Sequence, residues 1–251
     1  MGHVYNDAFY DYINAGSRAS AKVVIPIMQQ ALSVESLLDV GAGVGAWAAE
    51  WIAGGVRDVI AVDGDYARAL KLLVPDECFV AHDLGQPLDL GRRFDLVQTL
   101  EVAEHLPAEK ADAFVALLVR HGDVVLFSAA VPGQGGEHHV NEQHPEYWRQ
   151  KFARHGYACF DWLRPQIADR AEVQPWYRYN SLIFANAAGE ARLAEAVRAT
   201  RVADGDKVRM AGSFGWHLRR AIVGLMPETL VMGIATANAR RKAAAARRLA
   251  A

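Results

Sequence analysis

The stretch LLDVGAGVG, residues 37–45, decides the fold that we expect for this chain. It joins a short apolar run, Ser36–Val40, to a loop with little side-chain bulk, and a helical segment, Ala46–Ala53, follows. Glycines in such a loop permit unusual backbone angles and let a ligand approach the main chain. A strand, a glycine-rich turn and a helix in this order indicate the first unit of an α/β fold with a ligand at the turn.

Outward from this stretch, short apolar runs alternate with helical segments. Strands are expected at 36–40, 58–62, 79–81, 96–99 and 124–128, and helices at 20–32, 46–53, 66–73 and 107–119. Strands that alternate with helices indicate βαβ units and a parallel sheet. We therefore predict a Rossmann-like α/β fold, with a mostly parallel central sheet and helices on both of its faces.

Polar segments follow five of these expected strands. Ligands of such sheets bind beyond the carboxyl ends of the strands, so the five segments should converge at one edge. They are Asp39–Gly45, Asp63, His82–Asp83, Leu100–His105 and Val131–His144.

The composition is that of an ordinary globular protein. The 251 residues are 52% hydrophobic and 22% charged, and the net charge is −2. That total implies no overall attraction to nucleic acid or to an anionic membrane. No long apolar run and no signal segment is evident, and two cysteines are too few for a disulfide framework. We expect a cytoplasmic protein with no membrane partner, for which nucleic acid is an improbable ligand.

The chain changes character near residue 189. Residues 1–188 are expected to form the ligand-binding domain. Residues 189–251, rich in alanine, arginine and leucine, are expected to form a helical extension with helices at 216–226 and 230–248. The basic side chains after residue 240 suit a solvated helix end. A substrate lid, the arm of a homodimer and a surface for a polyanion are the alternatives.

The acids near the glycine loop narrow the choice of ligand. A dinucleotide loop would read G-x-G-x-x-G, whereas this loop reads G-x-G-x-G, and Asp39 stands two residues before its first glycine. A carboxylate there would repel a pyrophosphate and attract a cation. S-adenosylmethionine carries both an ammonium and a sulfonium. Asp63, about 20 residues after the loop, could accept hydrogen bonds from a ribose, and Asp83 from an adenine amino group. The alternative is that both acids cap turns.

These residues carry a family resemblance. LLDVGAGVGAWAAEW, VIAVDGD and AHDL, followed by the EVAEHLP segment at 101–107, resemble the motifs of class I S-adenosylmethionine-dependent methyltransferases. The resemblance implies that Asp39, Gly41 and Gly43 border the methionine part of the cofactor and that Leu100–Glu101 lies at its end. The cofactor-binding residues that we expect are Asp39, Gly41, Ala42, Gly43, Asp63, Gly64, His82, Asp83, Leu84, Leu100 and Glu101.

The segment Val131–Trp148 bears on the methyl acceptor. An amine need only be neutral to attack the methyl group, whereas a hydroxyl requires a base or a metal. Histidine titrates near neutral pH, so His144, or His139 in second place, is the candidate base. The alternative is that each is a loop histidine bonded to backbone. Glu104, His105 and His144 could also gather round a divalent cation such as Mg²⁺, although imidazoles do not favour that ion. Tyr147 or Trp176 could stack on a sugar.

The pattern GGEHHVNEQHPEYW, residues 135–148, is similar to that of bacterial methyltransferases that act on sugar hydroxyls, including mycobacterial enzymes of methylmannose polysaccharide synthesis. This resemblance implies O-methylation of a sugar or oligosaccharide, such as a mannoside, with His144 as the base. N-methylation of a small amine and O-methylation of a natural product are the near alternatives. An NAD-dependent oxidoreductase and a binding protein without catalysis are the distant ones.

Overall fold

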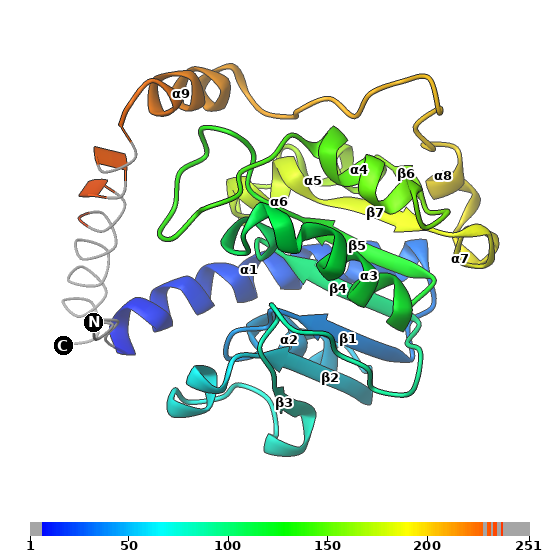
Figure 1. Cartoon of the computed structure of the whole chain (residues 1–251). Coiled ribbons are helices and arrows are strands. Elements are labelled where there is room, and N and C mark those ends of the chain that lie inside the picture. Colours follow the sequence, from blue (N-terminus) through cyan, green and yellow to red (C-terminus); the bar gives the residue numbers. More distant parts are fainter. Residues whose placement is uncertain (1–6, 228–229, 232, 235–236, 238–251) are drawn as a thin grey trace.

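A seven-stranded sheet forms the centre of the molecule in the computed structural model (Figure 1). The structure describes residues 7–227, 230–231, 233–234 and 237. The strand order is β3-β2-β1-β4-β5-β7-β6. The strands are β1 (Ser36–Val40), β2 (Asp58–Asp63), β3 (Phe79–Ala81), β4 (Leu96–Leu100), β5 (Val124–Ser128), β6 (Ala158–Phe160) and β7 (Leu182–Ala185).

The first five strands are parallel to one another. β1 lies between β2 and β4, and β7 joins β5 antiparallel, with β6 antiparallel to β7. Successive side chains of a strand point to opposite faces, so a strand buried on both faces is apolar throughout. Leu37 accordingly packs into the core on one face of the sheet and Leu38 into the core on the other.

Helices cover both faces of the sheet. The core on one face is formed with α1 (Asp7–Ala31), α2 (Ala46–Ala53), α5 (Leu163–Ile167) and α6 (Pro175–Asn180). The core on the other face is formed with α3 (Ala111–His121) and α4 (Pro145–Ala153). In α4, the aromatic rings of Trp148 and Phe152 are buried against Phe127 of β5. The Rossmann-like fold is thus confirmed.

The chain after β7 first stays on this body and then leaves it. Two short helices, α7 (Ala187–Arg192) and α8 (Glu195–Arg198), pack beside it; the Ala194 amide donates to the Ala31 carbonyl, and Val197 is fully buried. An extended segment then leads to α9 (Phe214–Gly224), at the edge of the molecule (Figure 1). In the described part of the chain, no helix is long and apolar enough to cross a membrane. The division at residue 189 stays a prediction.

Several expected helices differ in extent from those observed. The first helix was expected at 20–32, but α1 begins at Asp7. The expected helix at 66–73 is only a 3₁₀ turn, Asp65–Ala69, because the chain turns extended at Leu70. The helix expected at 107–119 is a 3₁₀ turn, Ala108–Lys110, continued by α3. Most of the helix expected at 230–248 lies outside the described residues.

Candidate functional site

The glycine loop after β1 has a backbone that only glycine accommodates easily. Gly41, Gly43 and Gly45 have φ angles of 80°, 57° and 87°, in the region that L side chains rarely adopt. Gly41 is also crowded, since an added Cβ would lie 2.3 Å from a methyl of Val102. The loop therefore turns tightly against the segment that follows β4.

The amides of this loop are already hydrogen-bonded within the protein. The Gly41 and Ala42 amides both donate to the Val62 carbonyl, at 2.8 and 3.1 Å. The Gly43 amide donates to the Asp63 carboxylate at 2.6 Å. These three donors, which a phosphate-binding loop would turn toward its ligand, point instead at the end of β2.

Asp39, on β1, is a buried carboxylate with one satisfied oxygen. Its side chain is 3% exposed, and its Oδ1 accepts from Gln98 Nε2 at 3.0 Å. Its Oδ2 is buried and has no hydrogen-bond partner among the described residues. Burial raises the pKa of Asp39 to about 7, with a further increase from the charge of Asp63, although the Gln98 hydrogen bond opposes the shift.

Gln98 orients this carboxylate from the neighbouring strand. It lies in the middle of β4, directly beside Asp39 in register, and it is 1% exposed. Its Oε1 accepts from Trp51 Nε1 of α2 at 2.9 Å, so its Nε2 must face Asp39. The sequence reasoning missed Gln98, although a glutamine inside the apolar run of β4 is the signal that could have revealed it.

A cavity of about 170 Å³ lies beside Asp39. We call it the Asp39 cavity. It includes five of the expected cofactor residues: Asp39, Gly41, Ala42, Gly43 and Leu100. The other lining residues are Asn14 and Ser17 of α1, Val44, Ala46, Trp47 and Tyr177. Asn14, Ser17 and Tyr177 were not expected from the sequence, because α1 and α6 reach the loop only through the tertiary fold. Trp47, in the first turn of α2 directly after the loop, was also not expected.

Asp63 ends β2 at the rim of the loop, as expected. Its carboxylate accepts three hydrogen bonds, from the amides of Gly43 and Gly64 and from the Tyr66 hydroxyl at 2.6 Å. The Tyr66 ring also covers Gly64, where an added Cβ would meet it at 2.7 Å. The Tyr66 side chain is itself 60% exposed.

The residues after β3 lie apart from the Asp39 cavity. The exposed Asp83 accepts from the Gly85 amide at 2.9 Å, so it caps a turn. His82 pairs through Nε2 with the Gln86 carbonyl, and Leu84 lines a separate groove. The structure does not bring these three residues to the Asp39 cavity, and their part in binding adenine stays a prediction.

A second polar cluster begins just beyond Leu100. Glu101 has a φ of 58°, rare for a residue with a side chain, and such strain is typical of functional positions. Its carboxylate accepts from Gln134 Nε2 at 2.6 Å and from Asn180 Nδ2 at 3.1 Å. Burial raises its pKa even though these amides oppose the shift. Glu101 is thus joined to the loop after β5, and it is not among the residues that line the Asp39 cavity.

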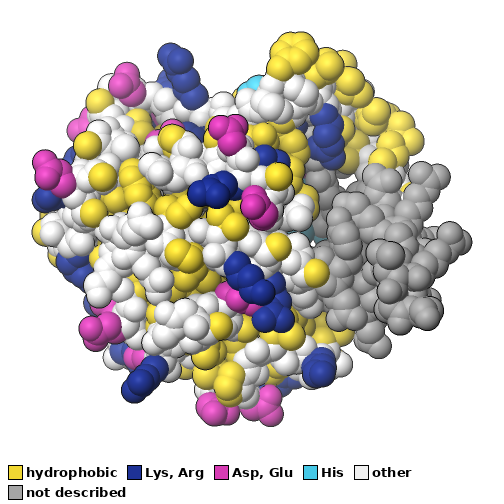
Figure 2. Space-filling model, turned by 180° about the vertical axis from the view of Figure 1, so that it is seen from behind, with side chains coloured by type: hydrophobic (Ala, Val, Ile, Leu, Met, Phe, Trp, Pro, Cys, Tyr) yellow, Lys and Arg dark blue, Asp and Glu magenta, His cyan; other side chains and the backbone are white. Residues whose placement is uncertain are grey.

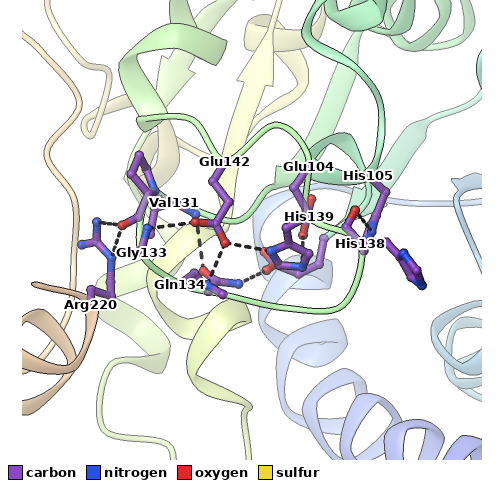
Figure 3. A network of polar contacts seen from close by, with 12 residues as sticks. Glu104, His105, Val131, Gly133, Gln134, His138, His139, Glu142 and Arg220 are labelled. Carbon is purple, nitrogen blue, oxygen red and sulfur yellow. Dashed lines mark hydrogen bonds and ion pairs between the residues drawn. The ribbon is translucent and has the colours of Figure 1, made fainter. Parts of the chain in front are cut away.

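Glu104, His105 and His139 meet in this cluster (Figure 3). One ligand atom from each lies within 4.8 Å of the other two. Glu104 is 0% exposed, and neither carboxylate oxygen has a hydrogen-bond partner among the described residues. His139 Nε2 is 4.0 Å from Glu104 Oε1. Burial, together with the charge of Glu101, raises the pKa of Glu104 well above its ordinary value.

The other ring nitrogen of each imidazole is held by the segment Val131–His144, which we call the histidine loop. His139 Nδ1 donates to Glu142 Oε1 at 2.9 Å, and His105 Nδ1 donates to the His138 carbonyl at 3.2 Å. Glu142 also accepts from the amides of Gly133 and Gly135 (Figure 3). Burial opposes ionisation of Glu142, but these hydrogen bonds lower its pKa overall. Sequence reasoning assigned Glu142 no role.

The remaining predicted residues lie around the histidine loop. His144 is exposed at the start of α4 and is not in the cluster of Glu104 and His105. The expected cation set is therefore corrected, since the fold of the loop brings His139 to these two residues instead. Lys151 lies over the Tyr147 ring at 4.6 Å, and the Trp176 ring packs edge-on against Tyr177.

Solved structures with a similar fold are known. No protein-family model and no curated protein sequence matches the chain. Among solved structures, it is similar to DesVI from Streptomyces venezuelae, with 15% identity, a TM-score of 0.55, and 72% of this chain and 96% of that chain covered. It is also similar to the sugar N-methyltransferase KedS8 from Streptoalloteichus, with 19% identity and a TM-score of 0.52. The match covers 74% of this chain and 94% of that chain. The fold is that of class I methyltransferases.

The buried Asp39 carboxyl predicts a specific pH dependence of stability. Its pKa is raised from 3.8 to about 7 in the folded protein, so the folded state keeps a proton that the unfolded state loses. Stability from this group therefore falls as pH rises from about 4 to 7. Asp39→Asn removes the penalty, and we expect it to exceed the unliganded wild type in stability at pH 8 by up to roughly 4 kcal/mol.

Urea denaturation at pH 5 and pH 8 measures this effect. The exposed Asp65→Asn variant is the matched control and should follow the wild type at both values. If the stability of Asp39→Asn depended on pH as that of the wild type does, the carboxyl would be ionised in the folded protein without a free-energy penalty, and the prediction would fail.

Proposed function

We propose that this chain, which has the class I methyltransferase fold, binds S-adenosylmethionine in the Asp39 cavity and transfers its methyl group. The observation that carries the proposal is the unpartnered Asp39 oxygen, buried in a cavity formed by the glycine loop. A buried carboxylate requires a cationic partner, and the α-ammonium of the donor supplies one. The Asp63 carboxylate would accept hydrogen bonds from the ribose hydroxyls, and Asp83 would lie on the adenine side of the cofactor.

A dinucleotide cofactor fits this site poorly. The amides of Gly41, Ala42 and Gly43 are already bonded to the end of β2, so they cannot bind a pyrophosphate. The carboxylates of Asp39 and Asp63 would repel its charge. This arrangement disfavours the NAD-dependent oxidoreductase that shares the general fold.

Ligand-induced thermal shifts test the choice of cofactor. S-adenosylhomocysteine keeps the ammonium of the donor, so it should raise the Tm of the wild type by several degrees, whereas NAD should leave the Tm unchanged. Since the ammonium favours ionised Asp39, affinity for S-adenosylhomocysteine should rise with pH up to about 7 and then level off. Asp39→Asn should weaken binding at least tenfold, and Asp65→Asn should not. A shift with NAD alone would overturn the proposal.

For the acceptor, we propose a hydroxyl of a sugar or oligosaccharide. Polar groups that could assist proton removal, His139 and His144, lie on the histidine loop beyond the carboxyl end of β5, next to the strand that supplies Leu100 to the cavity. An amine acceptor would need none of these groups. Tyr147 and Trp176 are the aromatic residues that we propose to contact the sugar. The name of KedS8 supports a second candidate, an amino sugar methylated on nitrogen.

The Glu104–His105–His139 cluster fits a divalent cation. Two ligands of a tetrahedral ion, each about 2.1 Å from it, lie about 3.4 Å apart. His139 Nε2 and Glu104 Oε1 are 4.0 Å apart, and the three candidate ligand atoms lie within 4.8 Å of one another, so the side chains would close on an ion by up to about 1.4 Å. Hydrogen bonds at both Nδ1 atoms leave the Nε2 atoms to ligate, as in known metal sites. Two imidazoles and a carboxylate suit Mn²⁺, Fe²⁺ or Zn²⁺ better than the Mg²⁺ expected from the sequence.

Within this arrangement the residues have separate roles. A bound cation would supply positive charge that lowers the pKa of an acceptor hydroxyl. Glu104, His105 and His139 would hold it, and Glu142 would keep His139 oriented. His144, which is exposed and outside the cluster, would accept the hydroxyl proton while the oxygen attacks the methyl carbon in line with the departing sulfur.

Metal binding can be measured without turnover. Mn²⁺ or Zn²⁺ should raise the Tm of the wild type, and Mg²⁺ should raise it less. Glu104→Gln and His139→Ala should lose at least nine-tenths of the Mn²⁺ affinity in calorimetry. The exposed His155→Ala, which removes an imidazole outside the cluster, should bind as the wild type does. Unchanged binding by both cluster variants would place the ion elsewhere.

The acceptor and the base are tested together by product mass spectrometry. Labelled S-adenosylmethionine is offered with a panel of mono- and oligosaccharides, amino sugars and small amines. His144→Ala should reduce turnover on a hydroxyl acceptor about 100-fold or more and leave S-adenosylhomocysteine affinity within twofold. Retained turnover would remove His144 as the base, and products on amines alone would establish the second candidate.

A further inference from the structure

The helix α9 is attached to the body of the protein by only one of its sides. Arg220 donates to the Pro132 carbonyl at 3.0 Å, and Arg219 donates to the Gln134 carbonyl at 2.8 Å. On the same side the Trp216 ring packs 5.4 Å from that of Tyr179. The polar side of the helix thus faces inward, onto the histidine loop.

The opposite side of α9 is apolar and exposed. Phe214 and Leu225 are 84% and 87% exposed, and Leu218 and Ile222 are 51% and 49% exposed. Their spacing of three and four residues places them on one helical stripe. Figure 2 shows hydrophobic side chains along the projecting upper right edge, where α9 lies when Figure 1 is turned by 180°.

The charge of this part of the chain differs in sign from the rest. Residues 207–251 contain nine Lys and Arg and one acid, a net charge of +8. The total is −2, so residues 1–206 carry −10. The nearly neutral total, on which we based the expectation of no membrane partner, conceals this separation.

We propose that the outer face of α9 binds the surface of an anionic lipid bilayer. An exposed apolar stripe followed along the chain by a strongly basic segment favours attachment to an anionic membrane surface. The apolar side chains would enter the boundary of the acyl chains, and the basic residues would be attracted to the anionic headgroups. The helix would lie along the surface, and its fixed arginines would hold the histidine loop beside it.

A second copy of the chain is a less suitable occupant. A helix of 11 residues is about 16 Å long and 10 Å wide, so the stripe covers on the order of 160 Å² in projection. Stable dimers bury about 800 Å² on each partner. Two positively charged segments of +8 would also repel each other, whereas an anionic surface attracts each of them.

Flotation with lipid vesicles tests the proposal, and it requires no methyl transfer. The full chain should bind vesicles of phosphatidylcholine with 30% phosphatidylglycerol at least tenfold more strongly than pure phosphatidylcholine, and high salt should weaken the binding. The variant Phe214→Ser/Leu218→Ser/Ile222→Ser should lose at least tenfold in binding. Tyr66→Ser, which removes an exposed large side chain outside α9 and the histidine loop, is the control and should bind vesicles as the wild type does. Thermal denaturation verifies that both variants are folded.

Analytical ultracentrifugation supplies the competing outcome. If the wild type forms a dimer that the triple variant abolishes, and vesicles do not bind, the face is an interface between copies and the proposal fails. Equal binding of the wild type and the triple variant, or binding of neither to vesicles, also overturns it.

Discussion

The arrangement of the site depends on one buried carboxylate. Asp39 lies within the sheet, where burial makes its charged form unfavourable, and only one of its oxygens has a hydrogen-bond partner in the described part of the chain. Gln98 and, behind it, Trp51 fix the side chain in one orientation. The second oxygen is left for whatever occupies the cavity. The unliganded protein therefore holds a group that is stable as a neutral acid or beside a cation, and this restricts the ligands that it can accept.

The same principle recurs a short distance along the sheet edge. The partly buried Glu101 lies near the buried Glu104, and its charge raises the pKa of Glu104. Two amides donate to Glu101, whereas neither oxygen of Glu104 has a hydrogen-bond partner among the described residues, and its Oε1 lies 4.0 Å from His139 Nε2. Both clusters thus hold carboxyl groups whose ionised form a nearby cation would favour. Because β1 and β4 are neighbours in the sheet, the two clusters lie at the same sheet edge.

The histidine loop connects this site to the outer part of the molecule. On the inner side of the loop, Glu142 accepts hydrogen bonds from His139 and from the amides of Gly133 and Gly135. On the outer side of the loop, Arg220 of α9 donates to the Pro132 carbonyl (Figure 3). The same loop thus carries both the contacts of α9 and the side chains that meet Glu104.

The sequence alone was sufficient for the parts of this protein that depend on local pattern. The strands β1, β3 and β5 and the helix α2 have the predicted ends, because apolar runs and glycines mark them directly. Asp39 and Gly41–Gly43 could be placed together at the turn after β1 because loop spacing and side-chain charge are local properties, and they line one cavity. The short strands β6 and β7, with three and four residues, were missed because such runs also fit other structures.

Only the tertiary structure decided which distant residues meet. His144 and His139 are equivalent by composition, but the loop carries His139 inward to Glu104 and leaves His144 exposed at the start of α4. Gln98, Tyr177 and Glu142 reach the site from separate elements, and no spacing along the chain encodes their distances. The outward apolar side of α9 likewise follows from how its arginines bind the histidine loop. Local pattern determines each element, whereas the packing between elements determines the site.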